Sequence, residues 1–148
     1  EEPELCVRLR RQGWSIHRLD HDMTLHDAAI TRFGQWWKRS TRAGHAYAEG
    51  AGLHGAPPER HGVVEVRRAL LWGLGIPLLA VLLALLAGPW GLLLLLAYPL
   101  QLLRLWRKSG SFARAWFLLV GKFAEATGIV KFHLTQLRGG TARIIEYK

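Results

Sequence analysis

Acidic side chains that could act in proton transfer are concentrated at the start of the 148-residue chain. Glu1, Glu2 and Glu4 flank Pro3, and this arrangement suits the first turn of a helix, where carboxylates complement the positive end of the helix dipole. A carboxylate can also serve as a general base that removes a proton from an attacking hydroxyl. The spacing of these three acids fits both roles.

A second group of potentially reactive side chains lies between residues 17 and 27. It mixes imidazoles and carboxylates, which are common metal ligands. Its members are His17, Asp20, His21, Asp22, His26 and Asp27. Their spacing matches no known metal motif, so we expect most of them to be solvated loop groups, and the sequence establishes no metal site.

Aromatic and basic side chains adjoin in the segment Gln35-Trp36-Trp37-Lys38-Arg39. Indole rings offer flat apolar faces on which a sugar can stack, so the segment could contact a glycan acceptor. The same tryptophans could instead pack a helix against a neighbouring domain or lie on a membrane. Both interpretations remain open at the level of sequence.

The elements that would hold these groups can be predicted from local patterns. We expect a helix over about residues 3–12 that stops at Gly13, followed by a strand over residues 14–17, where apolar and polar residues alternate. A capping box at Thr24 and Asp27 predicts a further helix of about twenty residues. A helix, a glycine and a strand in this order are typical of an α/β domain.

The strongest pattern is the run from Ala69 to Leu103, which contains no charged side chain. One helix of that length would measure roughly 50 Å, against a hydrocarbon core of ~30 Å. We therefore expect two antiparallel membrane helices joined by a turn at residues 88–91, Gly-Pro-Trp-Gly. The second arm is short for a full crossing, so a re-entrant or tilted hairpin remains an alternative, as does a buried hairpin of a soluble protein.

Basic residues flank this run on both sides. Arg67 and Arg68 precede it and further basic residues follow it, so the positive-inside rule places both ends of the hairpin in the cytoplasm. Residues 112–123 have apolar side chains at helical spacing, and we expect an interfacial helix there in preference to a third short crossing. The basic residues that we expect at the lipid headgroups are Arg104, Arg107, Lys108, Arg114 and Lys122.

The net charge of +9 is concentrated after the hairpin, where residues 104–148 hold nine basic and two acidic side chains. Because this basic segment adjoins a predicted membrane helix, we expect it to bind the lipid bilayer and no nucleic acid. The single cysteine, Cys6, excludes an internal disulfide and a CxxC site. The chain begins with Glu-Glu-Pro-Glu, so we expect it to be the C-terminal part of a longer protein.

The first residues resemble a motif of a known enzyme family. Glu1-Glu2-x-Glu4-Leu5-x-x-Arg8 is similar to the acidic-pair motif near the end of the GT-A catalytic domain of family 2 glycosyltransferases. The continuation TLHDAAITRFGQWWKRSTRAG, with an apolar hairpin and a basic tail, is similar to bacterial membrane-associated members.

The resemblance implies a mainly α chain that begins with the helix-strand end of an α/β catalytic domain. Its parts would be residues 1–48 of that domain, a Gly/Pro-rich linker over residues 49–66, a transmembrane hairpin over residues 67–108 and a basic amphipathic cytoplasmic tail over residues 109–148. The function implied is the membrane-anchoring end of an inverting glycosyltransferase, and the location implied is the bacterial inner membrane. The donor-binding part would precede Glu1, so the chain alone is expected to be inactive.

The resemblance also implies roles for individual residues. Glu2 stands where the family places its general base, although that residue is usually Asp. His26 resembles the histidine that reaches the metal-bound diphosphate. The segment that begins at Gln35 resembles the acceptor motif of processive members, Gln-x-x-Arg-Trp. It has Lys38 in place of the motif's Arg and Arg39 in place of its Trp, so processive synthesis is not expected. The acceptor candidates implied are Gln35, Trp36, Trp37 and Arg39.

For the full-length enzyme, the resemblance implies a divalent cation, Mg or Mn, a nucleotide-diphosphate sugar as donor and a glycan or lipid as acceptor. The alternative from another class is a non-catalytic membrane anchor or scaffold that binds anionic lipid or a partner protein. The two differ in whether the residues near Glu2 take part in sugar transfer.

Overall fold

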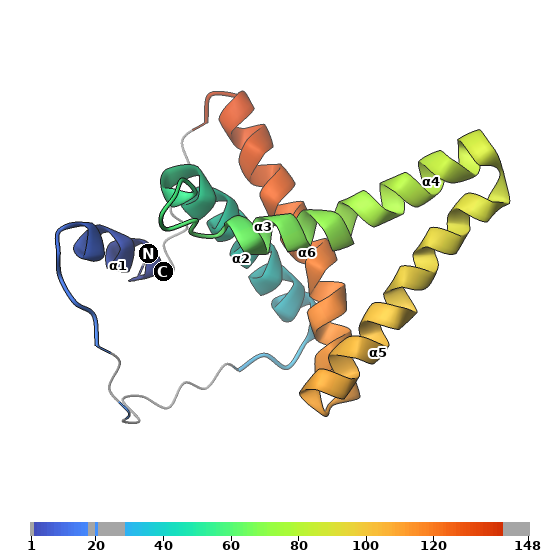
Figure 1. The fold of residues 1–148 in the computed structure, drawn as a ribbon, viewed down its shortest axis with the longest axis horizontal. Helices are drawn as coiled ribbons and strands as arrows, with labels where there is room; N and C mark the ends of the chain where they lie inside the picture. The colour runs from blue at the N-terminus through green and yellow to red at the C-terminus, as the bar shows by residue number, and fades with distance from the viewer. Residues whose placement is uncertain (1, 18–19, 21–28, 141–148) are drawn as a thin grey trace.

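Helices form every regular element in residues 2–17, 20 and 29–140, which the computed structural model describes (Figure 1). The expectation of a mainly α chain is therefore confirmed. The helices are α1 (Glu2–Arg11), α2 (Phe33–His54), α3 (Val63–Leu70), α4 (Ile76–Ala87), α5 (Ala97–Ser109) and α6 (Phe112–Leu137). A π-helical turn, η1 (Leu71–Gly75), joins α3 to α4, and a 3₁₀ helix, η2 (Pro89–Leu96), precedes α5.

The first predicted helix is confirmed, and the strand after it is not formed. α1 ends at Arg11, and Gly13 takes the left-handed conformation, with φ +86°, that a helix stop requires. Residues 14–17 are exposed and irregular. A strand needs a neighbour to pair its backbone groups, and the described residues contain no other strand.

α2 begins later and ends later than its pattern predicts. Its first residue is Phe33, whereas the predicted capping box at Thr24 and Asp27 lies outside the described residues. Its last residue is His54, so the helix extends into the segment predicted as a linker. Packing explains the extension, because Ala48 and Gly50 are buried against the rest of the molecule.

α6 is one continuous helix through Gly128, although a glycine that follows an amphipathic stretch would by itself predict a turn there. A Cβ atom at Gly128 would overlap the Thr41 carbonyl oxygen and approach the His45 nitrogen to 2.9 Å. At the same crossing, a Cβ at Gly44 would lie 2.6 Å from the Glu125 Cα atom. These glycines therefore allow the backbones of α2 and α6 to pack closely, and Gly128 marks a helix crossing, not a helix end.

The core lies where α2, α3 and α6 meet, and we call these three helices the head. Four side chains there are nearly inaccessible to solvent, and Val66 and Leu70 of α3 pack against them. The four are Ala48, Ala69, Ile129 and Phe132. The His45 ring meets the Phe132 ring edge-on, at 5.0 Å between centroids, and so joins α2 to α6.

The apolar run forms two arms that meet at Gly88 (Figure 1). The first arm is a continuous helix, Val63–Ala87, and it is the one helix within the described residues that is long and apolar enough to cross a membrane. The chain reverses at Gly88, where φ is +85°. Next to the turn the arms are in close contact, since a Cβ at Gly91 would lie 2.7 Å from the Leu83 Cβ. We call residues 76–96 the hairpin; whether it enters a membrane stays a prediction.

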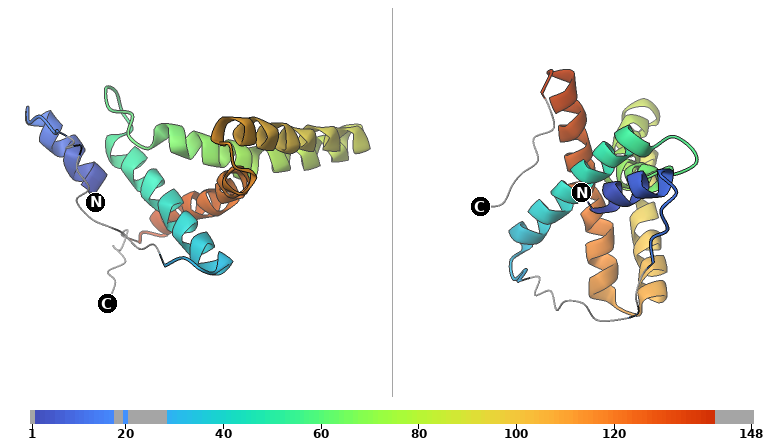
Figure 2. Two further views of the ribbon diagram at one scale, coloured as in Figure 1. Left: turned by 90° about the horizontal axis from the view of Figure 1, so that it is seen from below. Right: turned by 90° about the vertical axis from the view of Figure 1, so that its left-hand side faces the viewer.

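Away from the turn the arms diverge into a V, and α6 closes its open end (Figure 1). The view from below shows both arms projecting away from the side of the molecule that carries α1 (Figure 2). At the open end the Tyr98 ring stacks on Phe123 of α6 and meets Trp72 of the first arm edge-on, with centroids 5.7 and 5.8 Å apart. This aromatic group holds α5 against both neighbours.

Tyr98 also satisfies a backbone group that the π-helical turn leaves without a donor. The Ile76 N–H donates to the Leu71 carbonyl, five residues back. The next residue, Pro77, has no N–H to donate to the Trp72 carbonyl. The Tyr98 hydroxyl donates to that carbonyl instead. A local irregularity in the first arm is thus stabilised by the second arm.

Candidate functional site

The hairpin exposes an apolar surface that no other part of the described chain covers. Leu85, Leu86 and Trp90 near the turn are 79%, 76% and 75% exposed. Only 17% of the most apolar stretch of the first arm is buried inside the protein. By contrast, the Ile129 side chain in the head is fully buried. A contiguous apolar surface of this kind is typical of a site that contacts lipid or another protein.

Basic residues gather at the corner between α5 and α6, far from the hairpin turn. We call four of them the basal cations, and all four are exposed: Arg104, Arg107, Lys108 and Arg114. The Trp106 and Phe112 rings meet edge-on at this corner, with centroids 5.8 Å apart. The sequence has no acidic residue from Val66 to Ala124 to neutralise them. Aromatic and cationic groups together suit the headgroup layer of an anionic bilayer.

Lys122, the fifth predicted headgroup contact, has a partner within the protein. Its Nζ atom lies 2.6 Å from Glu125 Oε2, and the two side chains are 23% and 14% exposed. This pair lies where α6 crosses the first arm, because a Cβ at Gly73 would be 2.8 Å from the Lys122 carbonyl carbon. The structure therefore gives Lys122 a role in the helix crossing that the sequence pattern did not indicate.

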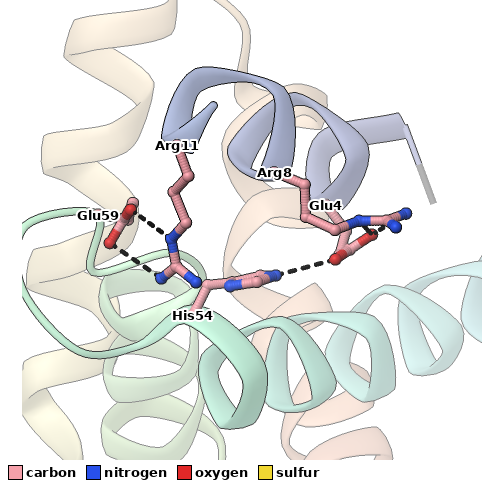
Figure 3. A network of polar contacts seen from close by, with 5 residues as sticks. All are labelled: Glu4, Arg8, Arg11, His54 and Glu59. Atoms are coloured by element: carbon pink, nitrogen blue, oxygen red, sulfur yellow. Dashed lines mark hydrogen bonds and ion pairs between the residues drawn. The ribbon is translucent and has the colours of Figure 1, made fainter. Parts of the chain in front are cut away.

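A polar junction attaches α1 to the end of α2 and to the loop that follows (Figure 3). It consists of Glu4, Arg8, Arg11, His54 and Glu59. Glu4 Oε1 lies 2.9 Å from His54 Nε2, and Glu4 Oε2 accepts a hydrogen bond from Arg8 Nε at 3.0 Å. Arg11 Nε donates to Glu59 Oε1 at 2.8 Å. α1 also buries the side chain of Val7, so the polar junction and this apolar contact together hold α1 in position.

The junction keeps its carboxylates ionised. Hydrogen bonding from His54, supported by the charge of Arg8, lowers the pKa of Glu4 below its ordinary value. Hydrogen bonds from Arg11 lower the pKa of Glu59 to about 2. A group with a low pKa is a weak base, so these two acids are suited to holding α1 in place and not to accepting a proton.

Sequence reasoning did not identify His54 or Glu59 as partners of α1. His54 and Glu4 are separated by 50 positions, and Glu59 and Arg11 by 48, so no spacing rule connects them. Both partners lie in the segment predicted as a linker. His54 is nearly completely buried, and its Nδ1 atom has no hydrogen-bond partner within the described residues. This burial results from tertiary packing, which the local sequence does not indicate.

The predictions of proton transfer and diphosphate contact concern Glu2 and His26. The side chain of Glu2 and the whole of His26 lie outside the part of the chain that the structure describes. Among the described residues, no group of three His, Cys, Asp or Glu side chains could hold a metal ion.

The four acceptor candidates lie on the first two turns of α2. Gln35 Oε1 accepts hydrogen bonds from the backbone nitrogens of Thr31 and Arg32, both at 3.1 Å, and so caps the helix. The Trp36 ring packs against Phe117 of α6, with centroids 4.9 Å apart. These contacts give Gln35 and Trp36 structural roles.

The other two candidates are placed differently. Trp37 is half-buried beside Phe33, and Arg39 is exposed. Trp37 lies 17 residues before His54 on α2, which is about 25 Å along the helix axis. Glu4 contacts His54 at the opposite end of α2. The structure therefore does not bring the acceptor candidates next to the acid-bearing helix.

An open cleft of about 720 Å³ lies beside the polar junction. Four carboxylates line it, from Glu4, Glu49, Glu59 and Glu65, together with Arg60 and His61. A nucleotide-diphosphate sugar is an anion, and anions are bound by Arg, Lys or backbone N–H groups. The acidic lining of this cleft is thus unsuited to the donor that the motif resemblance implies.

Comparison with known proteins identifies no relative of this chain. No protein-family model matches it, and neither a curated protein nor a solved structure is significantly similar to it. Its function is therefore inferred from its own residues and their arrangement.

Proposed function

We propose that the chain anchors the C-terminal end of a glycosyltransferase catalytic domain to the cytoplasmic face of a bacterial inner membrane. The observation that carries the anchoring is the exposed apolar hairpin, with its turn residues Leu85, Leu86 and Trp90 open to the surroundings. The basal cations at the opposite end of the arms support a cytoplasmic location for both ends.

The apolar content of the hairpin is large enough to hold a chain of this size in lipid. Residues 76–96 include eleven leucines and no charged side chain. Each leucine favours the membrane by about 0.3–0.6 kcal/mol in insertion experiments, which gives roughly 3–7 kcal/mol in total. The basal cations add about 1 kcal/mol each near an anionic surface.

A cell-fractionation experiment tests the anchoring. An embedded hairpin should stay in the membrane fraction through washes with concentrated salt and alkaline carbonate and leave it only with detergent. Recovery in the soluble fraction after the salt wash would show that charge alone holds the chain on the surface, and the anchoring proposal would fail.

Support for the enzymatic part of the proposal comes from the acidic motif and the order of the segments that follow it. In the proposed reaction Glu2 accepts the proton of an acceptor hydroxyl as the oxygen attacks the anomeric carbon of the sugar, and the nucleotide diphosphate leaves with the electron pair of the broken bond. Within the motif, Glu4 pairs with Arg8 across one helical turn and also contacts His54. They would orient the helix that carries Glu2.

Turnover measured on the full-length enzyme tests this part. Glu2→Gln removes the base but keeps the size of the side chain, so the rate of transfer should fall by about 10²–10⁴-fold while donor binding is retained. Arg10→Gln is the matched control, because Arg10 is exposed on the same helix. If both variants lose the same few-fold activity, Glu2 is not the base. If the full-length Glu2→Gln enzyme stays in the membrane and keeps its full rate of transfer, the chain would be a non-catalytic anchor.

A further inference from the structure

We infer that the hairpin is re-entrant: it enters the bilayer from the cytoplasmic face, turns within the hydrocarbon and leaves on the same face. Its partner is thus the cytoplasmic leaflet and the adjoining midplane of an anionic phospholipid membrane. This inference rests on the proposed membrane anchoring and adds a depth of insertion to it.

The first step is that α6 lies across the open end of the V (Figure 1). It touches the first arm at Gly73, where a Cβ would lie 2.7 Å from Ala126 Cβ. It touches the second arm through the stacked rings of Tyr98 and Phe123. Both arms are therefore held by α6 at these points, and only the residues beyond them are free to project into lipid.

The second step is that α6 carries charges at these contact points. The Lys122 and Glu125 side chains pair next to the Gly73 crossing, and Arg114 is exposed toward the start of the same helix. Charged side chains are strongly disfavoured in the hydrocarbon core and move to the headgroup layer. A helix that holds such groups along its length is placed at the interface, so α6 limits how deep the arms can go.

The third step is the length of the free arms. Ala87 is 14 residues beyond Gly73, which is about 21 Å of helix at ~1.5 Å per residue. On the second arm, the eight 3₁₀ residues of η2 span about 16 Å at ~2.0 Å each, and the first turn of α5 up to Tyr98 adds about 3 Å. Each arm thus extends about 20 Å beyond its contact with α6. Because the arms diverge, the depth of the turn below α6 is somewhat less than this length. The hydrocarbon core is ~30 Å thick, so the turn passes its midplane and does not reach the far headgroups.

The turn itself has the composition that hydrocarbon requires. Residues 87–91 carry no charged side chain. Pro89 has no N–H that would need a partner, and the Gly91 N–H donates to the Gly88 carbonyl at 3.1 Å. Because unpaired backbone groups are costly in lipid, the Gly88–Gly91 hydrogen bond and the missing N–H of Pro89 lower the cost of placing this turn inside the bilayer.

Thiol labelling of the whole chain tests the depth. In a Cys6→Ser background, L86C places a thiol near the turn and L53C places one at an exposed position on the head. A membrane-impermeant maleimide is then applied to intact spheroplasts, to inside-out vesicles and to detergent-solubilised protein. Position 86 is already exposed in the structure, so the cysteine should fit without repacking.

For a re-entrant hairpin, L53C is labelled in inside-out vesicles. L86C is labelled about tenfold or more faster in detergent than in spheroplasts or inside-out vesicles, because a thiolate does not form in hydrocarbon. Labelling of L86C in intact spheroplasts would show that the turn crosses the membrane; the inference would then be overturned while the anchoring stands. Equal labelling of L86C and L53C in inside-out vesicles without detergent would place the hairpin outside lipid and overturn both.

Discussion

Substitution of Gly128 by alanine tests the helix crossing on which the head depends. The new Cβ would overlap the Thr41 carbonyl oxygen and lie 2.9 Å from both the Thr41 carbonyl carbon and the His45 nitrogen. Carbon atoms pack favourably at about 3.5–4.0 Å, so α2 and α6 must move apart by roughly 1 Å or more at this point. Overfilling of a packed interior typically costs about 1–3 kcal/mol.

A gain in helix propensity opposes this cost. Alanine is favoured over glycine inside a helix by about 1 kcal/mol. We therefore expect Gly128→Ala to lower the free energy of unfolding by up to about 2 kcal/mol. Gly52→Ala is the matched control, because Gly52 lies inside α2 with open space around its Cα. The control should gain up to about 1 kcal/mol from propensity alone.

Thermal unfolding followed by circular dichroism in detergent micelles would measure both variants. The two melting temperatures should move in opposite directions, Gly128→Ala downward and Gly52→Ala upward or unchanged. If Gly128→Ala were as stable as Gly52→Ala, the two helices would not be in backbone contact at this crossing, and the arrangement of the head would be wrong.

Three further predictions concern the open end of the V, the polar junction and the basal cations. Tyr98→Phe leaves the Trp72 carbonyl without its donor, so thermal unfolding should show a loss of about 1–3 kcal/mol in the free energy of unfolding. Tyr47→Phe is the control and should lose less, because the Tyr47 hydroxyl has no hydrogen bond within the described residues. The pKa of Glu59 is lower in the folded protein than its ordinary 4.5, so its pairing with Arg11 is complete above pH 4.5 and is lost as the pH falls toward 2. Amide exchange of α1, referenced to α6, should accelerate over that range, and no change would show that the pair does not hold α1. Neutralising all four basal cations should weaken partitioning into anionic vesicles by roughly two to three orders of magnitude at low salt, and an equal loss with neutral vesicles would refute the electrostatic basis.

The parts of the fold that follow from local patterns could be predicted from the sequence. α1 begins with acidic residues in its first turn and is followed by a glycine that takes the left-handed conformation, and both signals are local to the helix. The reversal at Gly88 follows similarly from the Gly-Pro-Trp-Gly turn inside an apolar run. Such signals are read from neighbouring residues and need no knowledge of the tertiary contacts.

The features that depend on distant contacts could not be predicted. Gly128 has the local signature of a helix stop, and only the presence of α2 beside it shows that the glycine serves close packing. Residues 14–17 alternate as a strand does, yet no strand adjoins them within the described residues. Tertiary context decides both positions.

The candidate site also contains residues that the sequence indicates and contacts that only the structure shows. The basal cations lie in one stretch and were predicted together, whereas the partners in the polar junction come from segments some fifty positions apart. Gln35 and Trp36 were chosen for their chemistry, and their capping and ring contacts could be seen only in the structure. The composition of a segment therefore predicts a contact with lipid, which stays a prediction, but it does not indicate which side chains are already engaged within the protein.

The most direct test of the account is flotation of the purified chain with anionic vesicles in about 1 M salt, where the Debye length is only ~3 Å and surface charge is screened. Two aspartates at exposed hairpin positions, in the double variant L85D/L86D, should cost about 5–7 kcal/mol in the membrane, which matches or exceeds the gain from the leucines. We predict that the parent chain and L53D, altered at an exposed leucine of the head, float with the vesicles and that L85D/L86D stays behind. Equal flotation of all three proteins, or of none, would contradict insertion of the hairpin.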